Sequence, residues 1–195
     1  MAGIPVGGTA RKRRMQTTID RNLILTGYMG PTQLVIARRT AELLRLRFVD
    51  FDQLFETRSG EAREDLRALY GEARLKALET ELVDEIMLYR GTVIHIGGQT
   101  LLHGNHLARL SETGDIIVLV AALDVVLQRL HLALGARYHN PRERELAVGV
   151  LKREWAIRKL PGVTEVDTSE LSEEAMIDEI AARWRALSGV IDWRA

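Results

Sequence analysis

The sequence predicts an α/β protein, a three-layer sandwich in which a five-stranded parallel sheet carries helices on both faces. Short, nearly continuous apolar runs alternate along the chain with longer segments whose apolar residues recur at helical spacing. Strands that alternate with helices form parallel sheets, and strands buried on both faces are apolar throughout. Hydrophobic residues make up 46% of the 195 residues and charged residues 28%, which is ordinary for one globular domain.

Five short segments are the expected strands. NLILTG and DIIVLVAA are apolar almost throughout, as strands buried on both faces are. RFVDFD ends in two aspartates, GTVIHIGG runs into two glycines, and GVTEVDTS is the weakest of the set. In chain order the expected strands cover 22–27, 47–52, 91–98, 115–122 and 162–169.

Helices are expected between these strands. The long helical region is expected to break near Gly71. Ser172 is expected to cap the last helix, with an acidic pair in its first turn, where negative charge interacts favourably with the helix dipole. The expected helical ranges are 33–46, a segment from residue 53, 61–90, a segment ending at 134, a segment from the polar loop at 135–144 to about 158, and 172–187.

The domain is expected to cover 21–188, between a flexible basic leader at 1–20 and a tail at 189–195. No apolar core of a signal peptide closely follows the basic run at 11–14. Charged and polar residues interrupt the most apolar stretch, 116–134, so we expect a strand and an amphipathic helix there and no membrane span.

The charge balance and the cysteine count narrow the function classes. The formal net charge is zero, which gives no support for binding to nucleic acid. The absence of cysteine excludes disulfides and thiolate chemistry and fits a reducing compartment, so we expect a cytoplasmic protein. The basic leader and the apolar tail residues Val190, Ile191 and Trp193 are candidate contacts for a protein partner or a second copy of the chain.

Ligands of parallel α/β sheets bind beyond the carboxyl ends of the strands. Here those ends carry a glycine loop after the first strand, Asp50 and Asp52 after the second, and Gly97-Gly98 after the third. We expect these features to converge on one site. The loop LTGYMGPTQLV has the outline of the phosphate-binding motif G-x-x-x-x-G-K-[ST].

The ordered set of motifs resembles the shikimate kinase family, which has the nucleoside-monophosphate-kinase fold. The set is strand and GYMG loop, FVDFDQLFETRSG, GEARLKALETE, VIHIGGQTLL, and LKREWAIRKL before VDTS. The resemblance covers roughly residues 22–187 and implies a P-loop kinase fold with a phosphate-donor side and an acceptor side.

On the donor side, the resemblance matches Gly27 and Gly30 to glycines of the phosphate loop. The second signature glycine falls on Thr32, the lysine on Gln33 and the magnesium-binding hydroxyl on Leu34. A β-branched residue resists positive φ, glutamine carries no charge for the phosphates, and leucine offers no metal ligand. Efficient phosphoryl transfer is therefore not expected.

On the acceptor side, the resemblance assigns Asp50 to magnesium placement and Asp52 to the substrate hydroxyl, as a possible base. Gly97 and Gly98 match two of three glycines against which the substrate ring packs, and Gln99 replaces the third.

The resemblance also implies a clamp for the substrate carboxylate. Lys76 replaces the family's clamp arginine and lacks its bidentate fork, Glu79 would orient the clamp, and Arg153 matches a second carboxylate-binding arginine. Arg137 is the candidate lid arginine.

Structural interpretations compete with each of these roles. Asp52 is also well placed to cap the next helix, and Lys76 and Glu79 have the spacing of a surface pair on one helix. The two glycines suit close backbone packing. His103 and His106 have the spacing of metal ligands, but surface positions at a helix start are favoured; His95 lies within a strand and is expected to be a satisfied core residue.

Three functions follow from these patterns. The first is a pseudoenzyme without a cofactor, which binds a small anionic ligand or acts as a structural or interaction subunit. The second is an active shikimate kinase with an unorthodox loop, which requires ATP and magnesium. The third is a nucleotide-independent enzyme that uses Asp52 as a base.

Overall fold

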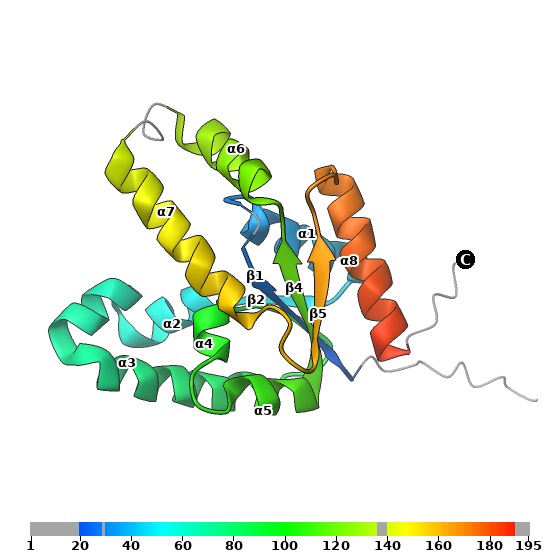
Figure 1. Cartoon of the computed structure of the whole chain (residues 1–195). Coiled ribbons are helices and arrows are strands. Elements are labelled where there is room, and N and C mark those ends of the chain that lie inside the picture. Colours follow the sequence, from blue (N-terminus) through cyan, green and yellow to red (C-terminus); the bar gives the residue numbers. More distant parts are fainter. Residues whose placement is uncertain (1–19, 29, 136–139, 190–195) are drawn as a thin grey trace, which may run out of the picture.

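The computed structural model describes residues 20–28, 30–135 and 140–189, and its centre is a five-stranded parallel sheet (Figure 1). The strand order is β2-β3-β1-β4-β5, so β1 lies in the middle of the sheet. The predicted α/β class and the number of strands are confirmed. The strands are β1 Asn22–Gly27, β2 Arg47–Asp50, β3 Thr92–His95, β4 Gly114–Val120 and β5 Val163–Asp167.

The helices cover the two faces of this sheet (Figure 1). Helices α1 and α8 pack against each other on one face, whereas α3 and α5 lie on the other. The helices are α1 Gln33–Leu44, α2 Phe51–Ser59, α3 Arg63–Ile86, α4 Gly98–Leu101, α5 His106–Thr113, α6 Leu123–Leu134, α7 Pro141–Glu154, the 3-10 helix η2 Trp155–Ile157 and α8 Glu173–Ser188.

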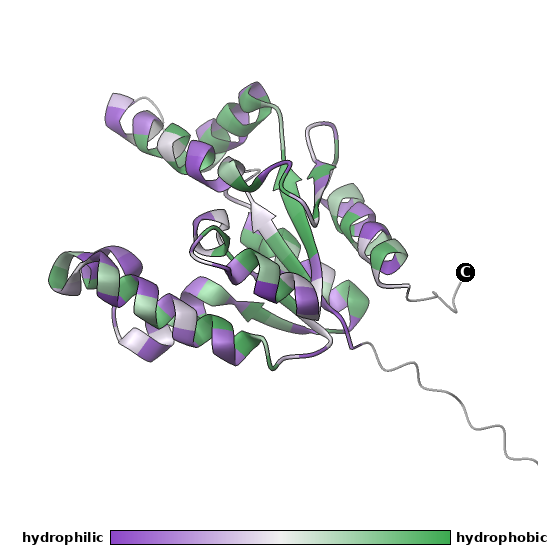
Figure 2. Ribbon diagram, turned by 60° about the horizontal axis from the view of Figure 1, so that its bottom comes forward, coloured by the Kyte–Doolittle hydropathy of each residue, from purple (hydrophilic) through white to green (hydrophobic). Residues whose placement is uncertain are grey.

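Strand β1 contributes side chains to the apolar cores on both faces of the sheet, because successive side chains of a strand point to opposite faces. Leu23 and Leu25 pack with α1 and α8, whereas Ile24 packs with α2 and α3. All three side chains are fully buried. Figure 2 shows the consequence: the central strands are hydrophobic, and the helices carry polar residues on their outer sides.

Three boundaries differ from those expected. Strand β2 ends at Asp50, the N-cap position of α2, so Asp52 lies in the first turn of that helix and does not cap it. Two helices, α4 and α5, fill the stretch between β3 and β4, for which the sequence predicted only a helix start near His103 and His106 and no helix bounds. Helix α7 begins inside the expected polar loop, because the Asn140 side chain accepts a hydrogen bond from the backbone N–H of Arg142 and Pro141 takes the first helical position.

The expected break in the long helical region is present. Gly71 has φ 82° and ψ 171°, a conformation that only glycine adopts readily, and α3 kinks there. Residues 1–19 and 190–195 lie outside the described residues, and with them the basic run of the leader and most of the tail. Among the described helices, none has the length and apolar character needed to cross a bilayer.

Trp184 connects the last helix to the central strand. Its side chain is 1% exposed, and its indole N–H donates to the backbone oxygen of Asn22, at a distance of 3.2 Å. The Asn22 side chain in turn bonds the backbone of Tyr89 and Thr92. One buried hydrogen-bonded cluster therefore joins α8, β1 and the start of β3.

We expect Trp184→Ala to lower the free energy of unfolding by about 3–5 kcal/mol, because it removes a large buried side chain and leaves the Asn22 carbonyl without its donor. Urea unfolding followed by far-UV circular dichroism measures this loss. A loss below about 1 kcal/mol would mean that the contact of α8 with the sheet does not depend on this side chain.

Candidate functional site

The three features expected to converge do so at the carboxyl edge of the sheet. Strand β3 lies between β1 and β2, with Leu25 paired with His95 on one side and Asp50 paired with His95 on the other. The loop after β1, the start of α2 and the Gly97-Gly98 segment therefore share one end of the sheet. Parallel pairing is the cause, because it places every strand's carboxyl end at the same edge.

The loop after β1 turns sharply at two glycines. Gly27 has φ +93°, and an added Cβ atom would collide with the backbone oxygen of Leu119 in β4. Gly30 has φ +131°, and an added Cβ atom would lie 3.2 Å from the side chain of Arg129. Thr32, at the position of the missing glycine, has a right-handed helical conformation at the N-cap of α1. The loop therefore accommodates threonine by starting the helix there.

Gln33, at the position of the family lysine, points back into the protein. Its side chain is buried, and Nε2 donates to the backbone oxygen of Gly27 at 3.0 Å. The same Nε2 lies 3.3 Å from Nε2 of His95, and Nδ1 of His95 lies 3.2 Å from Oδ1 of Asp50. An amide nitrogen only donates, so His95 accepts at Nε2 and donates from Nδ1 to Asp50. A continuous hydrogen-bonded chain thus runs from the loop backbone through Gln33 and His95 to Asp50.

These residues do not fit a magnesium-bound triphosphate of the kind that a P-loop kinase holds. The Gln33 amide is uncharged and bonded to its own loop, and the Leu34 side chain carries no oxygen that could bind magnesium. The two cations that follow Gln33 along α1 contact other residues. Arg38 lies over the Phe48 ring, and Arg39 pairs with acidic residues at the start of α8.

Two residues for which the sequence predicted no role, Trp155 and Arg129, contact the loop after β1. Trp155, in η2, donates from its indole N–H to the backbone oxygen of Tyr28 at 2.9 Å. Arg129, in α6, packs its side chain against Gly30 and donates to the hydroxyl and backbone oxygens of Thr168, at 3.1 and 2.6 Å. No spacing rule relates these residues to the loop, because they reach it from α6 and from the segment after α7.

On the acceptor side, Arg63 is the central residue, and sequence reasoning missed it. Its Nε donates to Asp52 at 2.7 Å, one terminal nitrogen to Glu79, and the other to the Thr100 hydroxyl at 2.9 Å. Its guanidinium also lies over the Phe55 ring, 4.9 Å from the centroid. Burial lowers the pKa of Arg63, but the charges of Asp52 and Glu79 outweigh it and the pKa is raised. Arg63 is therefore charged throughout the physiological range.

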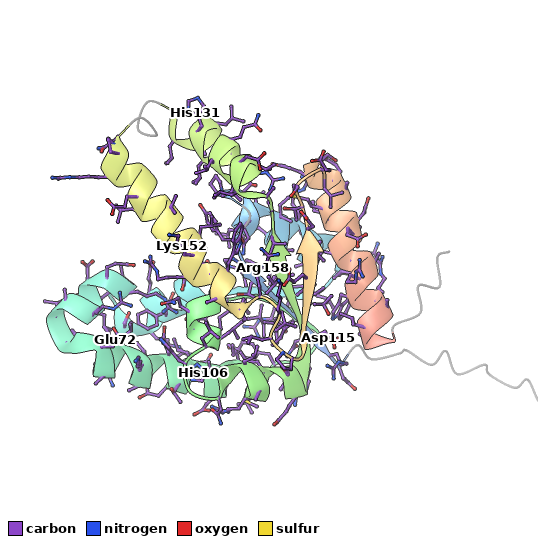
Figure 3. The ribbon with its side chains drawn as sticks, in the orientation of Figure 1. Glu72, His106, Asp115, His131, Lys152 and Arg158 are labelled. Atoms are coloured by element: carbon purple, nitrogen blue, oxygen red, sulfur yellow. The ribbon has the colours of Figure 1, made fainter. Side chains whose placement is uncertain are left out.

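Glu79 is buried in the middle of α3, and its carboxylate is fully partnered. It accepts from Arg63 and from Thr100 Oγ1, at 3.1 Å for the latter, and contacts His103 Nδ1. Lys76, the sequence candidate for the clamp, is half exposed and lies 3.8 Å from Glu72, which Figure 3 labels on α3. The alternative surface pair between Lys76 and Glu79 is therefore not formed.

Glu154, the last residue of α7, lies against the glycine pair. One of its carboxylate oxygens accepts from the backbone N–H of Gly98, and an added Cβ atom on Gly98 would lie 2.7 Å from the Glu154 backbone oxygen. The glycine is required for this close approach of α7. Arg153, the sequence candidate for a carboxylate-binding residue, is exposed on the same turn. Burial raises the pKa of Glu154, with a smaller contribution from the charge of Asp52.

We call Asp52, Arg63, Glu79, Gly98 and Glu154 the acceptor region. Arg63 bonds both Asp52 and Glu79 directly, and it also bonds Thr100 in α4. Gly98, at the start of α4, bonds Glu154. Gly97 lies beside Glu154, and Gln99 is exposed. Arg137, the candidate lid arginine, lies outside the described residues.

The two histidines with metal-ligand spacing have other partners. His106, labelled in Figure 3, is buried, with Nδ1 2.8 Å from the Thr100 backbone oxygen and Nε2 3.1 Å from the Thr80 hydroxyl. The expected surface position is thus wrong for His106. Across the described part of the chain, no group of three or more metal-ligating side chains is placed to hold an ion.

Comparisons with known proteins identify the family and the fold. The family model described as shikimate kinase matches residues 29–185. A shikimate kinase of Geobacter sulfurreducens is 32% identical over 83% of this chain and 89% of its own length, and one of Rhizobium meliloti is 29% identical over 91% and 93%. The crystal structure of shikimate kinase from Bacteroides thetaiotaomicron superposes with a TM-score of 0.68, at 22% identity, over 87% of this chain and 99% of that one.

The Arg63 contacts predict a large loss of stability when the charge is removed. We expect Arg63→Met to lower the free energy of unfolding by about 3 kcal/mol, because it leaves the buried Glu79 carboxylate without its main partner. Arg67→Met is the matched control, since Arg67 pairs with Glu72 at 2.8 Å with both side chains about half exposed; its cost should stay below about 1 kcal/mol. Equal losses in the two variants, measured by urea unfolding, would contradict the role of Arg63.

The raised pKa of Glu154 predicts a pH dependence of stability. A carboxyl whose pKa is higher in the folded state holds its proton longer there, so stability is lost as pH rises from the ordinary value of 4.5 through the raised value. Glu154→Gln removes this titration. We expect the wild type to lose stability relative to Glu154→Gln across this window, measured by urea unfolding at several pH values. If the two proteins differed in free energy of unfolding by the same amount at every pH, the burial of this carboxyl would be contradicted.

Proposed function

Because this chain belongs to the shikimate kinase family, we propose that it is a binding subunit that keeps the family fold and does not transfer phosphate from ATP. The observation that supports this proposal best is the position of Gln33. The residue in the lysine position hydrogen-bonds its own loop and His95, so it neither carries nor presents a charge to a phosphate.

The expected loss of transition-state stabilisation for phosphoryl transfer supports the proposal. Removing one preorganised transition-state donor costs about 10²–10³ in rate. Gln33 and Leu34 remove a cation and a metal ligand from the same phosphate site, and such losses need not multiply.

The acceptor region gives independent support. A general base needs a free lone pair directed at the substrate hydroxyl. One oxygen of the Asp52 carboxylate accepts from Arg63, which also holds Glu79 in place. A guanidinium bonded to the carboxylate makes it a weaker base toward a substrate hydroxyl.

We infer that the protein acts through binding, in the cytoplasm, as part of a larger assembly or as a holder of a small ligand. The absence of cysteine suits a reducing compartment, and the zero net charge gives no support for a nucleic-acid partner. A protein partner or a second copy of the chain would engage the leader or the tail.

An active shikimate kinase is the second candidate. Its support is that two relatives named shikimate kinase match most of the chain at 32% and 29% identity. Asp50 and Asp52 also stand beside the phosphate loop at the carboxyl edge of the sheet. Under this alternative, ATP and magnesium would be required, with Asp50 near the metal and Asp52 near the substrate hydroxyl.

Calorimetric titration with magnesium-ATP separates the two candidates. We expect no saturable binding to the wild type at ligand concentrations up to about the millimolar range, because the loop has no positive charge to pair with the phosphates. The triple variant Thr32→Gly, Gln33→Lys, Leu34→Ser restores the three signature residues and should gain saturable binding. Val35→Ser, an exposed change on the same helix turn, is the control and should bind no better than the wild type.

Micromolar binding by the wild type, followed by shikimate-dependent release of ADP, would refute the proposal in favour of the kinase. Failure of a folded triple variant to bind would show that more of the site than the loop has lost the ability to hold ATP.

A further inference from the structure

We propose that α7 is the surface through which two copies of this chain associate, with the two helices antiparallel and related by a two-fold axis. The contacting residues are Pro141, Glu145, Val148, Gly149 and Lys152, which we call the α7 stripe. This surface differs from the leader, the tail, the phosphate loop and the acceptor region. The inference goes beyond the proposed function, because it holds whether or not the chain transfers phosphate.

The α7 stripe forms one side of its helix. Its members recur every three or four residues, and together they line a hollow of about 450 Å³. The two ends of the stripe are exposed, and its centre is half-buried. The residues that attach α7 to the rest of the protein lie on other sides of the helix: Leu151 packs in the core, and Glu154 bonds Gly98. The stripe therefore stays accessible to a partner.

Glu145 and Lys152 give the stripe one charge of each sign. They are seven residues apart, which is about two turns of the helix. Among the residues that the structure describes, none forms an ion pair with either side chain. Figure 3 labels Lys152 near the middle of α7. Both charges are thus available to a second molecule.

This charge pattern is complementary to itself. A two-fold axis that passes between Val148 and Gly149 is equally far from Glu145 and Lys152 along the helix. An antiparallel second copy then places its lysine opposite this glutamate and its glutamate opposite this lysine, which gives two identical ion pairs. A parallel second copy would instead bring like charges together, which is unfavourable. The charges therefore specify an antiparallel pair of helices.

Gly149 is the second observation in favour of a close partner. Glycine is less stable than alanine inside a helix, so its presence there calls for a reason. The protein itself provides none, because an added Cβ atom would meet only the guanidinium end of Arg153, at 3.5 Å. In the antiparallel pair, Val148 of one copy faces the glycine of the other. A residue without a side chain at this point lets the two helices approach closely.

The size of the stripe sets the expected strength of association. One side of one helix from each copy is a small interface, at the low end for specific contacts between proteins. We therefore expect a reversible dimer whose dissociation constant is about 10–500 μM. Exposed ion pairs are screened by salt, so the dimer should weaken as the salt concentration rises.

Sedimentation velocity of the full-length protein, at about 10 μM to 1 mM, measures this association. Glu145→Lys brings like charges together at both ends of the interface, and Lys152→Glu does the same. We expect each variant to associate about tenfold more weakly than the wild type, or worse. The double variant Glu145→Lys, Lys152→Glu restores both ion pairs with their signs exchanged and should associate within about threefold of the wild type. Glu112→Lys, the same charge change at an exposed position of α5, is the control and should leave association unchanged.

Gly149→Leu tests the close approach separately from the charges. Leucine favours the helix, so the midpoint of urea unfolding should not fall, whereas association should weaken about tenfold or more because the side chain separates the two helices. Far-UV circular dichroism of each variant checks that the fold is kept.

A wild type that stays monomeric up to millimolar concentration would overturn the proposal, and this measurement needs no variant. A dimer that persists unchanged in both single charge variants would place the interface elsewhere and would also overturn it. Failure of the folded double variant to recover association would contradict the antiparallel pairing of Glu145 with Lys152.

Discussion

The buried carboxylate of Glu79, in the middle of α3, needs partners for its charge. The contacts of those partners hold the acceptor region together. Glu79 is fully buried, and an unpaired charge at such a position would be strongly destabilising. Arg63, Thr100 and His103 surround it, and they come from the start of α3, from α4 and from the loop that follows. The same guanidinium then reaches Asp52 in α2. Contacts of one buried carboxylate and its arginine partner thus join α2, α3, α4 and the loop after α4.

Near the loop after β1, polar side chains are likewise bonded to one another. Gln33 satisfies the Gly27 carbonyl and His95, and His95 satisfies Asp50. Glu154 likewise satisfies the Gly98 N–H. These groups lie at one edge of the sheet and are bonded to one another.

Sequence reasoning placed the sheet, the glycine loop and the two aspartates correctly, and it identified the family that the comparisons support. It gave no bounds for α4 and α5, which lie between β3 and β4, although it expected a helix start near His103 and His106 and α5 buries His106 and Leu110 at helical spacing. It assigned the carboxylate clamp to Lys76 and Arg153 by position in a motif, and this assignment stays a prediction; both side chains are exposed in the described structure. Arg63, Glu154 and Trp155 carry contacts of the site, and no role was predicted for them, although Glu154 and Trp155 lie within the motif LKREWAIRKL.

By itself, the sequence determined the order of strands and helices, the turn at Gly27, the kink at Gly71 and the loss of the lysine and hydroxyl from the phosphate loop. These are local properties, set by apolar periodicity, glycine conformation and side-chain chemistry. Only the tertiary structure decided which charges meet. Arg63 lies 16 residues from Glu79, and Glu154 lies 56 residues from Gly98. Long side chains find partners through the packing of whole elements, which no short spacing in the chain encodes.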